Sequence, residues 1–282
     1  MAATTISNAM TIDVEDYFQV SAFESHIARE TWPQLACRVE ANIDRILALL
    51  DGAGIKATFF TLGWIAERYP AMVRRIVSQG HELASHGYAH RRASDQTEIE
   101  FRDDVGRSKA LLEDIGGQRV LGYRAPSFSI GSRNLWALDV LLNAGYRYSS
   151  SIYPIRHDHY GMPDAPRFAF YPNGSDGLLE LPITTVRMMR RNLPAGGGGY
   201  FRFFPYAMSR WLMRRVNDRD GQAAIFYFHP WELDPGQPKQ QNIGFKTRFR
   251  HYVNLDRMES RLQALTRDFR WGRMDTIFLP NR

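Results

Sequence analysis

The sequence predicts an α/β fold built on a parallel sheet. Short apolar segments alternate along the chain with longer segments whose apolar residues recur at helical spacing, and this alternation is typical of βαβ units. Polar side chains of kinds used in catalysis directly follow several of the apolar segments. Catalytic groups of parallel folds gather at the carboxyl ends of the strands, so these side chains are expected to meet.

Strands and helices are predicted in strict alternation over most of the chain. The strands are expected at residues 10–16, 56–62, 81–85, 120–123, 146–152, 178–184 and 223–229, and the helices at residues 40–54, 65–79, 97–115, 134–144, 206–217 and 255–269. In the first helix, Ile43, Ile46 and Leu50 repeat at helical spacing. Glycines close each of the first four helices, as is usual at helix ends.

Length and composition favour one folded domain. The chain has 282 residues, of which 44% are hydrophobic and 23% charged, as in ordinary globular proteins. The net charge is +6, but the basic residues are spread out, which favours a solvated basic surface over a nucleic-acid site. The single cysteine, Cys37, excludes an internal disulfide, and its apolar neighbours predict a buried structural thiol.

The N-terminal residues do not have the pattern that predicts a signal peptide. Residues 1–9 are small and polar and lack the basic and apolar regions of a signal peptide. No apolar run approaches the roughly 18 residues that a membrane span needs. We therefore expect a cytoplasmic protein without a transmembrane segment, and the sequence does not determine its oligomeric state.

A histidine pair lies in the stretch 81–90. His86 and His90 are four residues apart, so one helical turn or a tight loop brings both imidazoles to the same side. Two such nitrogens suit Zn²⁺ or a similar metal, and a catalytic metal usually has a third protein ligand and an open position for water. The alternative is a turn that happens to contain two histidines.

Three acids follow the first predicted strand. Asp13, Glu15 and Asp16 come directly after an apolar segment, and buried acids are costly unless they are paired or bind a metal. The alternative is a solvated turn, or a helix cap made by Asp16.

Two further strand ends carry single basic side chains. Arg124 ends an apolar run that is fixed by Pro126, and His229 ends the continuous apolar strand near residue 228. The four strand ends therefore carry acids, a histidine pair, an arginine and a histidine. Each feature alone is a weak sign of an active site, but the series is specific, because all four features stand at the ends of predicted strands.

This ordered series resembles the motifs of the polysaccharide deacetylases of carbohydrate esterase family 4, which have the NodB-homology fold. The matching stretches are residues 11–16, 85–90, 124–126, 148–152 and 228–230. The resemblance implies a deformed (β/α)7 barrel, one domain over residues 1–282, and a C-terminal extension from about residue 236 that packs on the barrel. The stretches 13–20, 200–202 and 245–252 resemble the exopolysaccharide-locus, exosortase-associated subgroup.

The resemblance also implies an activity and a role for each residue. It implies a metal-dependent hydrolase that removes N-acetyl groups from N-acetylhexosamine units of a polysaccharide or its precursor. Asp13 would be the general base, Arg124 would orient it, and His229 would protonate the leaving nitrogen. A divalent metal, preferably Zn²⁺ with Co²⁺, Ni²⁺ or Mn²⁺ as alternatives, would be held by His86, His90 and one acid.

The sequence departs from the family pattern at two places. The second acid of the first motif is either Glu15, which the register favours, or Asp16, which has the usual ligand type; we prefer Asp16, with Glu15 as the alternate. Ser149 stands where the family has an aspartate that tunes the histidine, and Asp158 or Glu180 would have to replace it.

These departures leave two alternatives to deacetylation open. The unusual acid motif favours a hydrolase of amides or cyclic imides on the same fold. The missing aspartate favours a catalytically silent glycan-binding protein.

Substrate contacts are expected from loops around the strand ends. The main-chain N–H of Ser127 is a candidate oxyanion donor, and Trp231 lies beside His229 in the sequence. Tyr200 and Arg202 follow a Gly-rich stretch and are expected at the rim, where aromatic side chains stack on sugars. The alternative for this stretch is a flexible linker.

A basic aromatic segment is expected to cross the mouth of the site. In residues 245–252, basic residues alternate with Phe245, Thr247 and Phe249, so an extended strip would have one basic face. The basic face would comprise Lys246, Arg248 and Arg250. A helix capped by Asn254 would hold this strip on the barrel. The alternative is a solvated basic loop.

Overall fold

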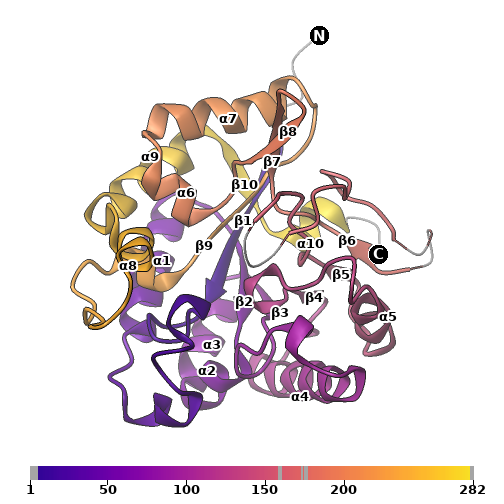
Figure 1. Ribbon diagram of the computed structural model, residues 1–282, viewed down its shortest axis with the longest axis vertical. Coiled ribbons are helices and arrows are strands. Elements are labelled where there is room, and N and C mark those ends of the chain that lie inside the picture. Colours follow the sequence, from indigo (N-terminus) through magenta and orange to yellow (C-terminus); the bar gives the residue numbers. More distant parts are fainter. Residues whose placement is uncertain (1–5, 158–160, 173, 175–176, 280–282) are drawn as a thin grey trace.

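The computed structural model describes residues 6–157, 161–172, 174 and 177–279. Its main sheet has eight strands, ordered β10-β1-β2-β3-β4-β5-β6, with β9 also paired to β1, and every pair is parallel. The strands are β1 (Ser7–Val14), β2 (Thr58–Thr61), β3 (Glu82–Ser85), β4 (Gly122–Tyr123), β5 (Tyr148–Ser149), β6 (Leu179–Glu180), β9 (Ile225–Phe228) and β10 (Arg270–Gly272). The predicted α/β class and the deformed barrel are confirmed (Figure 1).

Strand β1 is the centre of the sheet. It pairs with β10 near its start, through residues 7–9, and further on with β9 and with β2. The pairing with β10, which the sequence analysis missed, joins the two ends of the chain. Asp13 lies in the last part of this central strand, and Glu15 and Asp16 directly follow it. The strands β2 and β9 therefore flank this group of acids.

The barrel is not closed by a continuous ladder between β6 and β9. The segment between them forms an antiparallel hairpin, β7 (Thr185–Met188) and β8 (Arg191–Pro194), which was also unpredicted. Single contacts span the seam: the Ile225 N–H donates to Thr184 Oγ1 at 2.6 Å, and Gly197 forms a bridge with Tyr227.

Helices surround the sheet (Figure 1). They are α1 (Val39–Gly52), α2 (Gly63–Arg68), α3 (Pro70–Ser78), α4 (Glu98–Gly116), α5 (Trp136–Asn143), α6 (Gly198–Phe203), α7 (Tyr206–Asp218), α8 (Phe245–Tyr252), α9 (Met258–Asp268) and α10 (Met274–Phe278). The predicted helix 65–79 is broken because Pro70 cannot continue α2 and instead starts α3. The Gly-rich stretch is not a linker, because its second half forms α6.

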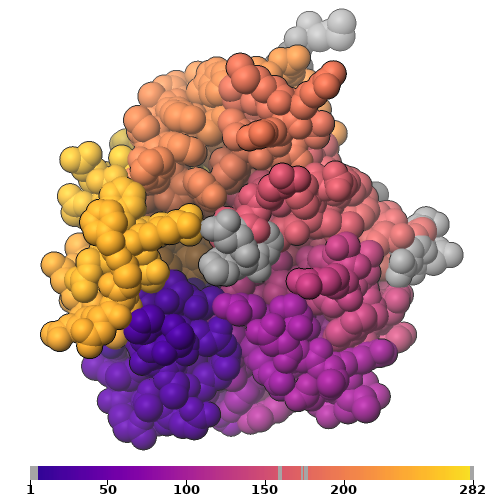
Figure 2. All heavy atoms as spheres, in the orientation of Figure 1, coloured from indigo at the N-terminus to yellow at the C-terminus, as the bar shows by residue number. Residues whose placement is uncertain are grey.

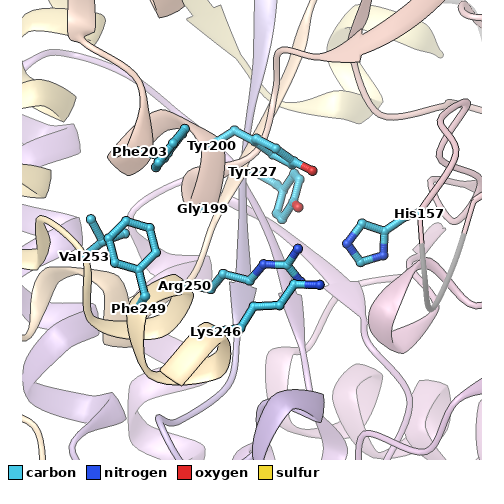
Figure 3. Close-up of a pocket in the computed structure, with 9 residues that line it drawn as sticks. All are labelled: His157, Gly199, Tyr200, Phe203, Tyr227, Lys246, Phe249, Arg250 and Val253. Carbon is cyan, nitrogen blue, oxygen red and sulfur yellow. The ribbon is translucent and has the colours of Figure 1, made fainter. Parts of the chain in front are cut away.

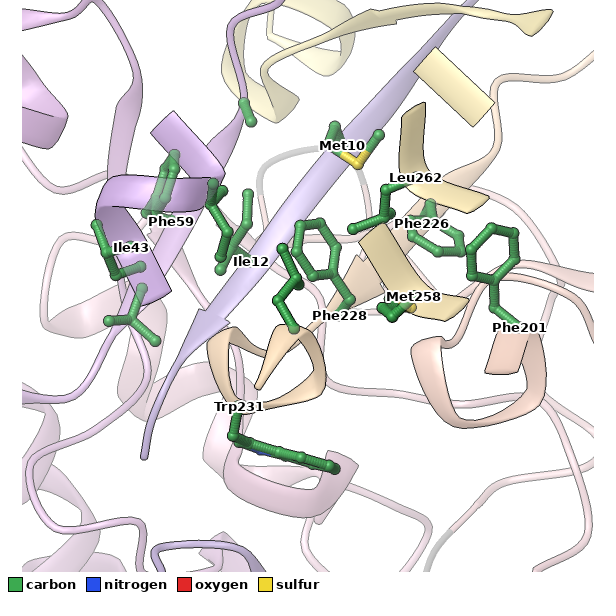
Figure 4. Packing of buried hydrophobic residues seen from close by; sticks show 14 of the residues in the cluster. Met10, Ile12, Ile43, Phe59, Phe201, Phe226, Phe228, Trp231, Met258 and Leu262 are labelled. Atoms are coloured by element: carbon green, nitrogen blue, oxygen red, sulfur yellow. The ribbon is translucent and has the colours of Figure 1, made fainter. Parts of the chain in front are cut away.

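The C-terminal segment packs on the central strands. Met258 and Leu262 of α9 lie in the same buried cluster as Met10 of β1 and Phe226 of β9 (Figure 4). Asn254 occupies the expected N-cap position, directly before the helical turn that starts at Leu255, but its side chain does not cap that turn: the residue has a φ of 50°, and its side chain donates to the Arg202 carbonyl. Cys37 is half-buried rather than fully buried. Over the described residues, no helix combines the length and the apolar character needed to cross a bilayer.

Candidate active site

The four strand ends singled out in the sequence meet at one place. Asp13 lies in β1, His86 follows β3, Arg124 follows β4 and His229 follows β9. Asp13, His86, Arg124 and His229 are joined by close contacts, described below, although more than 200 residues separate the first from the last. Parallel pairing of β1 with β2 and β9, and of β3 with β4, brings the carboxyl ends of these strands to the same edge.

The histidine pair lies on a tight loop and not on a helical turn. Gly87 and His90 both have positive φ, at 76° and 51°, which bends the chain sharply between the two imidazoles. Arg29 fixes the loop from outside by donating to the carbonyls of Ala89 and His90 at 3.0 and 3.2 Å. His86 Nδ1 lies 2.8 Å from the Arg124 carbonyl, and a proton there leaves Nε2 free to act as a ligand.

The third member of this cluster is Glu15. Ligand atoms of Glu15, His86 and His90 lie within 4.8 Å of one another, and all three residues are buried. Glu15 Oε2 is 2.8 Å from His90 Nε2, and Glu15 Oε1 is 3.4 Å from His229 Nε2. Two imidazoles and a carboxylate that are buried and converge in this way fit a divalent ion such as Zn²⁺.

The preference for Asp16 as the third ligand is corrected by its hydrogen bonds. Its carboxylate accepts the N–H of Tyr17 at 2.7 Å and those of Arg38 and Val39 at 2.6 and 2.9 Å. Val39 begins α1 and Arg38 directly precedes it, so Asp16 caps this helix from another segment, and it is not a member of the Glu15, His86 and His90 group. Burial raises the pKa of Asp16 to about 6, although these three N–H groups lower it.

Asp13 is held by a fully buried arginine. Arg124 Nη1 donates to Asp13 Oδ1 at 2.6 Å and to Thr11 Oγ1 at 2.9 Å, and its side chain has no solvent exposure. The rest of the guanidinium is fixed by the carbonyl and the hydroxyl of Ser150. The other oxygen of Asp13 is 4.0 Å from His229 Nε2 and lines the same small cavity as the histidines.

His229 has a carboxylate partner that the sequence analysis missed. Its Nδ1 lies 2.8 Å from Glu232 Oε1, and Glu232 Oε2 accepts from Arg202 Nε at 2.6 Å. Burial alone would lower the pKa of His229, but the charges of Glu15, Glu232 and Asp13 raise it to about 9. Glu232 follows His229 by three residues, a spacing that would have been the signal.

Of the two replacements proposed for the family aspartate, Glu180 has other partners. Glu180 accepts the N–H groups of Ser151 and Ile152 at 2.9 and 2.8 Å instead. Ser149 donates to the Ser151 hydroxyl at 2.8 Å. Asp158 lies outside the described residues.

Two of the expected substrate contacts are part of the support for His229. Trp231 stacks between His229 and His251, with ring centroids 5.2 and 4.2 Å away, and it also donates to Glu15 Oε1 at 3.3 Å. The expected role of Arg202 at the rim is corrected: its side chain is 1% exposed, because the guanidinium binds Glu232 and backbone carbonyls.

The remaining expected contacts line an open cleft. Ser127 has a φ of 56°, hydrogen-bonds Ser21 through its hydroxyl, and lines a cavity of about 170 Å³ with the acids and histidines. Tyr200 lines a neighbouring cavity of about 400 Å³. The strip 245–252 is not extended but forms α8, so Lys246 and Arg250 share one face and Arg248 does not.

Comparison with known proteins divides the chain in two. Residues 32–149 match the family model described as polysaccharide deacetylase, and residues 150–279 match one described as a domain of unknown function (DUF3473). A peptidoglycan deacetylase of Helicobacter pylori is 30% identical over 113 residues, which is 40% of this chain and 38% of the relative. A chitooligosaccharide deacetylase of Sinorhizobium fredii is 32% identical over 146 residues, which is 50% of this chain and 60% of the relative.

Solved structures share the fold over nearly the whole chain. A putative polysaccharide deacetylase from Mycobacterium smegmatis has a TM-score of 0.61 at 21% identity and covers 98% of this chain and 89% of its own. A CE4 family pseudoenzyme from Bacillus anthracis has a TM-score of 0.50 at 14% identity and covers 98% of this chain and 66% of its own. Residues 32–149 are therefore similar to polysaccharide deacetylases, and the solved structures show the same fold. The chain spans less than two thirds of the length of these two curated relatives.

Proposed function

We propose that this protein is a metal-dependent hydrolase that removes N-acetyl groups from N-acetylhexosamine units of a polysaccharide or its precursor. One observation carries the proposal: Glu15, His86 and His90 form a buried set beside two further polar pairs. In one pair Arg124 holds the carboxylate of Asp13, and in the other Glu232 holds His229. Two relatives are named as a peptidoglycan deacetylase and a chitooligosaccharide deacetylase, and these names support N-deacetylation of a glycan.

Each side chain has a task that its contacts support. A divalent metal bound by Glu15, His86 and His90 would lower the pKa of a coordinated water and polarise the acetyl carbonyl. Asp13, oriented by Arg124, would accept the proton of the attacking water. His229, oriented by Glu232, would donate a proton to the leaving nitrogen. The main-chain N–H of Ser127 is proposed as the donor to the oxyanion.

The catalytically silent alternative depends on the loss of the family aspartate. In this chain Glu232 provides a buried carboxylate to His229, so that loss is compensated from another element. We therefore favour an active enzyme. The amide or cyclic-imide alternative is tested by including ureide and imide substrates in the same assay.

The experiment measures acetate release together with metal content. Purified protein should release acetate from N-acetylglucosamine oligomers, lose this activity with a chelator and regain it with Zn²⁺ or Co²⁺. The absence of release from a broad panel of N-acetylated glycans by metal-loaded protein would contradict the proposal. Membership of the exopolysaccharide-locus, exosortase-associated subgroup and a cytoplasmic location remain proposals from the sequence.

A further inference from the structure

We propose that Phe203 and Phe249 form a binding position for a second sugar ring of the glycan that reacts at His229. The substrate would then be an oligosaccharide or polymer of β-linked N-acetylglucosamine-type sugars, and a single sugar would bind poorly. This inference rests on the proposed function, because it names the substrate class of the same site.

Three phenylalanines form an exposed aromatic group where α6 and α8 meet. Phe203, Phe245 and Phe249 are 54%, 84% and 44% exposed. The ring centroids of Phe203 and Phe249 are 6.1 Å apart, and those of Phe245 and Phe249 are 6.4 Å apart with an angle of 21° between the rings. A single exposed apolar side chain is ordinary, but a contiguous group of them is typical of a binding surface.

The pair of rings from Phe203 and Phe249 lines a cavity that continues into the catalytic site. This cavity has a volume of about 400 Å³, and Figure 3 shows the two rings together at one end of it. It shares Gly199 and Arg250 with a second cavity of about 490 Å³, which His229 also lines. Figure 2 shows the hollow on this face, bordered by α8 and by the N-terminal segment. A glycan that places one sugar at His229 can therefore extend along the hollow to the two rings.

The lining of the first cavity suits a sugar better than a purely apolar ligand. In a β-linked chain of glucose-type sugars the ring substituents are equatorial, so both faces of each ring carry C–H bonds. Aromatic side chains pack against such apolar faces. Arg250 lines both cavities and offers N–H donors to the sugar hydroxyls. A lipid tail would pack on the rings but could not bond to the guanidinium.

Arg202 fixes the two rings relative to the catalytic histidine. It directly precedes Phe203, and its guanidinium donates to two carbonyls at the C-terminal end of α8, the helix that carries Phe249, at 2.9 and 2.7 Å. Its Nε also donates to Glu232, the partner of His229, at 2.6 Å. Buried bonds therefore set the separation between the rings and His229, so a glycan must reach a minimum length to occupy both. A fixed position of this kind lowers the entropy cost of binding.

Calorimetric binding of two oligosaccharides tests the proposal. The probes are hexa-N-acetylchitohexaose and N,N′-diacetylchitobiose, titrated into metal-loaded Asp13→Asn protein so that turnover does not consume them. We expect the hexasaccharide to bind at least roughly tenfold more tightly than the disaccharide. Adding Phe203→Ser and Phe249→Ser together should weaken hexasaccharide binding roughly tenfold and change the Kd of the disaccharide by less than about twofold.

Two controls separate lost stacking from a disturbed fold. The conservative pair Phe203→Tyr/Phe249→Tyr keeps both rings, so it should bind the hexasaccharide as the parent does. Trp211→Ser removes another exposed aromatic side chain, from α7, and Trp211 is not among the described residues that line the two cavities. This variant should leave the Kd of both probes unchanged.

The proposal is overturned if the hexasaccharide has no advantage, if the serine pair weakens both probes equally, if the tyrosine pair also loses binding, or if Trp211→Ser has the same effect. It is also overturned if the serine pair keeps hexasaccharide binding but loses binding to phosphatidylglycerol–phosphatidylcholine vesicles, since the rings would then serve a lipid. Binding is measured apart from turnover, so the result is separate from that of the acetate assay. A chain that binds the hexasaccharide through the rings, but whose wild type releases no acetate, would keep this inference and lose the proposed activity.

Discussion

Residues 6–149 and residues 150–279 contribute to the same cleft, but they hold their functional side chains in different ways. In the first part, Asp13, His86 and Arg124 lie at or directly after the ends of the parallel strands β1, β3 and β4. Their backbone is fixed by the sheet, and neighbouring strands supply their partners, as when the Arg124 carbonyl meets His86.

In the second part, a single strand end carries His229, and side chains from loops and short helices support it. Glu232, Arg202 and Trp231 form this support, with His251 of α8 completing the stack. At Gly198 of α6, an added Cβ would lie 2.3 Å from Glu232 Oε1, so a glycine is needed there. The positions of the proposed metal ligands thus depend on the sheet, whereas the orientation of His229 depends on a buried ion pair contributed by the second part.

The largest effect is expected from the histidines of the first part. His86→Ala or His90→Ala should abolish metal binding and lower turnover by more than about 10³-fold, because the remaining two ligands cannot hold the ion. The fold should survive, since both side chains lie at strand ends outside the apolar clusters. Elemental analysis and circular dichroism check this, and full metal occupancy in either variant would refute the assignment.

Asp13→Asn should separate chemistry from metal binding. The amide keeps the shape of the side chain but cannot accept a proton, so turnover should fall about 10²–10⁴-fold while metal content stays unchanged. Steady-state kinetics and metal analysis of the same sample test whether turnover falls while the metal content stays unchanged. Loss of metal would make Asp13 a ligand and reassign the roles of the acids.

A smaller effect is expected from the ion pair of the second part. Glu232→Gln should lower kcat by roughly 10²-fold with metal content unchanged, because His229 loses the charge that orients and stabilises its protonated form. Burial alone would raise the pKa of Glu232, but the charges of Arg202 and His229 lower it to about 2, so the carboxylate is ionised at neutral pH.

Glu259→Gln is the control for this prediction, since its carboxylate is exposed and pairs with Arg45 away from the cleft. Gly198→Ala should reproduce part of the loss by displacing Glu232. Equal activity of Glu232→Gln and the wild type would show that the second part does not position the histidine.

The smallest effect concerns stability and not turnover. Burial raises the pKa of Glu180 to about 7 from 4.5, so the folded chain holds this proton more tightly than the unfolded chain. Its contribution is therefore fully present below about pH 4.5 and is lost as the pH rises through about 7. In denaturant titrations, the free energy of unfolding of Glu180→Gln should fall less than that of the wild type over this range. If the free energy of unfolding falls equally with pH in the variant and the wild type, the raised pKa of Glu180 is contradicted.

The sequence predicted the parts of the site that depend on strand ends. Asp13, His86, Arg124 and His229 each end a recognisable apolar run, and parallel pairing alone brings such ends together. The choice between Glu15 and Asp16 could not be made, because it depends on which carboxylate meets the N–H groups of α1, a segment more than 20 residues away.

The support of His229 was missed for a similar reason. Arg202 was placed at the rim because aromatic and glycine residues surround it, but burial against Glu232 depends on how α6 packs on the segment after β9. The strip 245–252 alternates in sequence like a strand, and only tertiary packing makes it helical. Strand β10 is short and lies just after the last predicted helix, where no element was predicted.

The metal content of Glu15→Gln and Asp16→Asn, purified side by side with the wild type, tests the central claim most directly. The account predicts that Glu15→Gln loses the metal together with acetate release. Asp16→Asn should keep the metal and lose only about 1 kcal/mol of stability, through a weaker cap on α1. A metal-free Asp16→Asn beside a fully loaded Glu15→Gln would contradict the account.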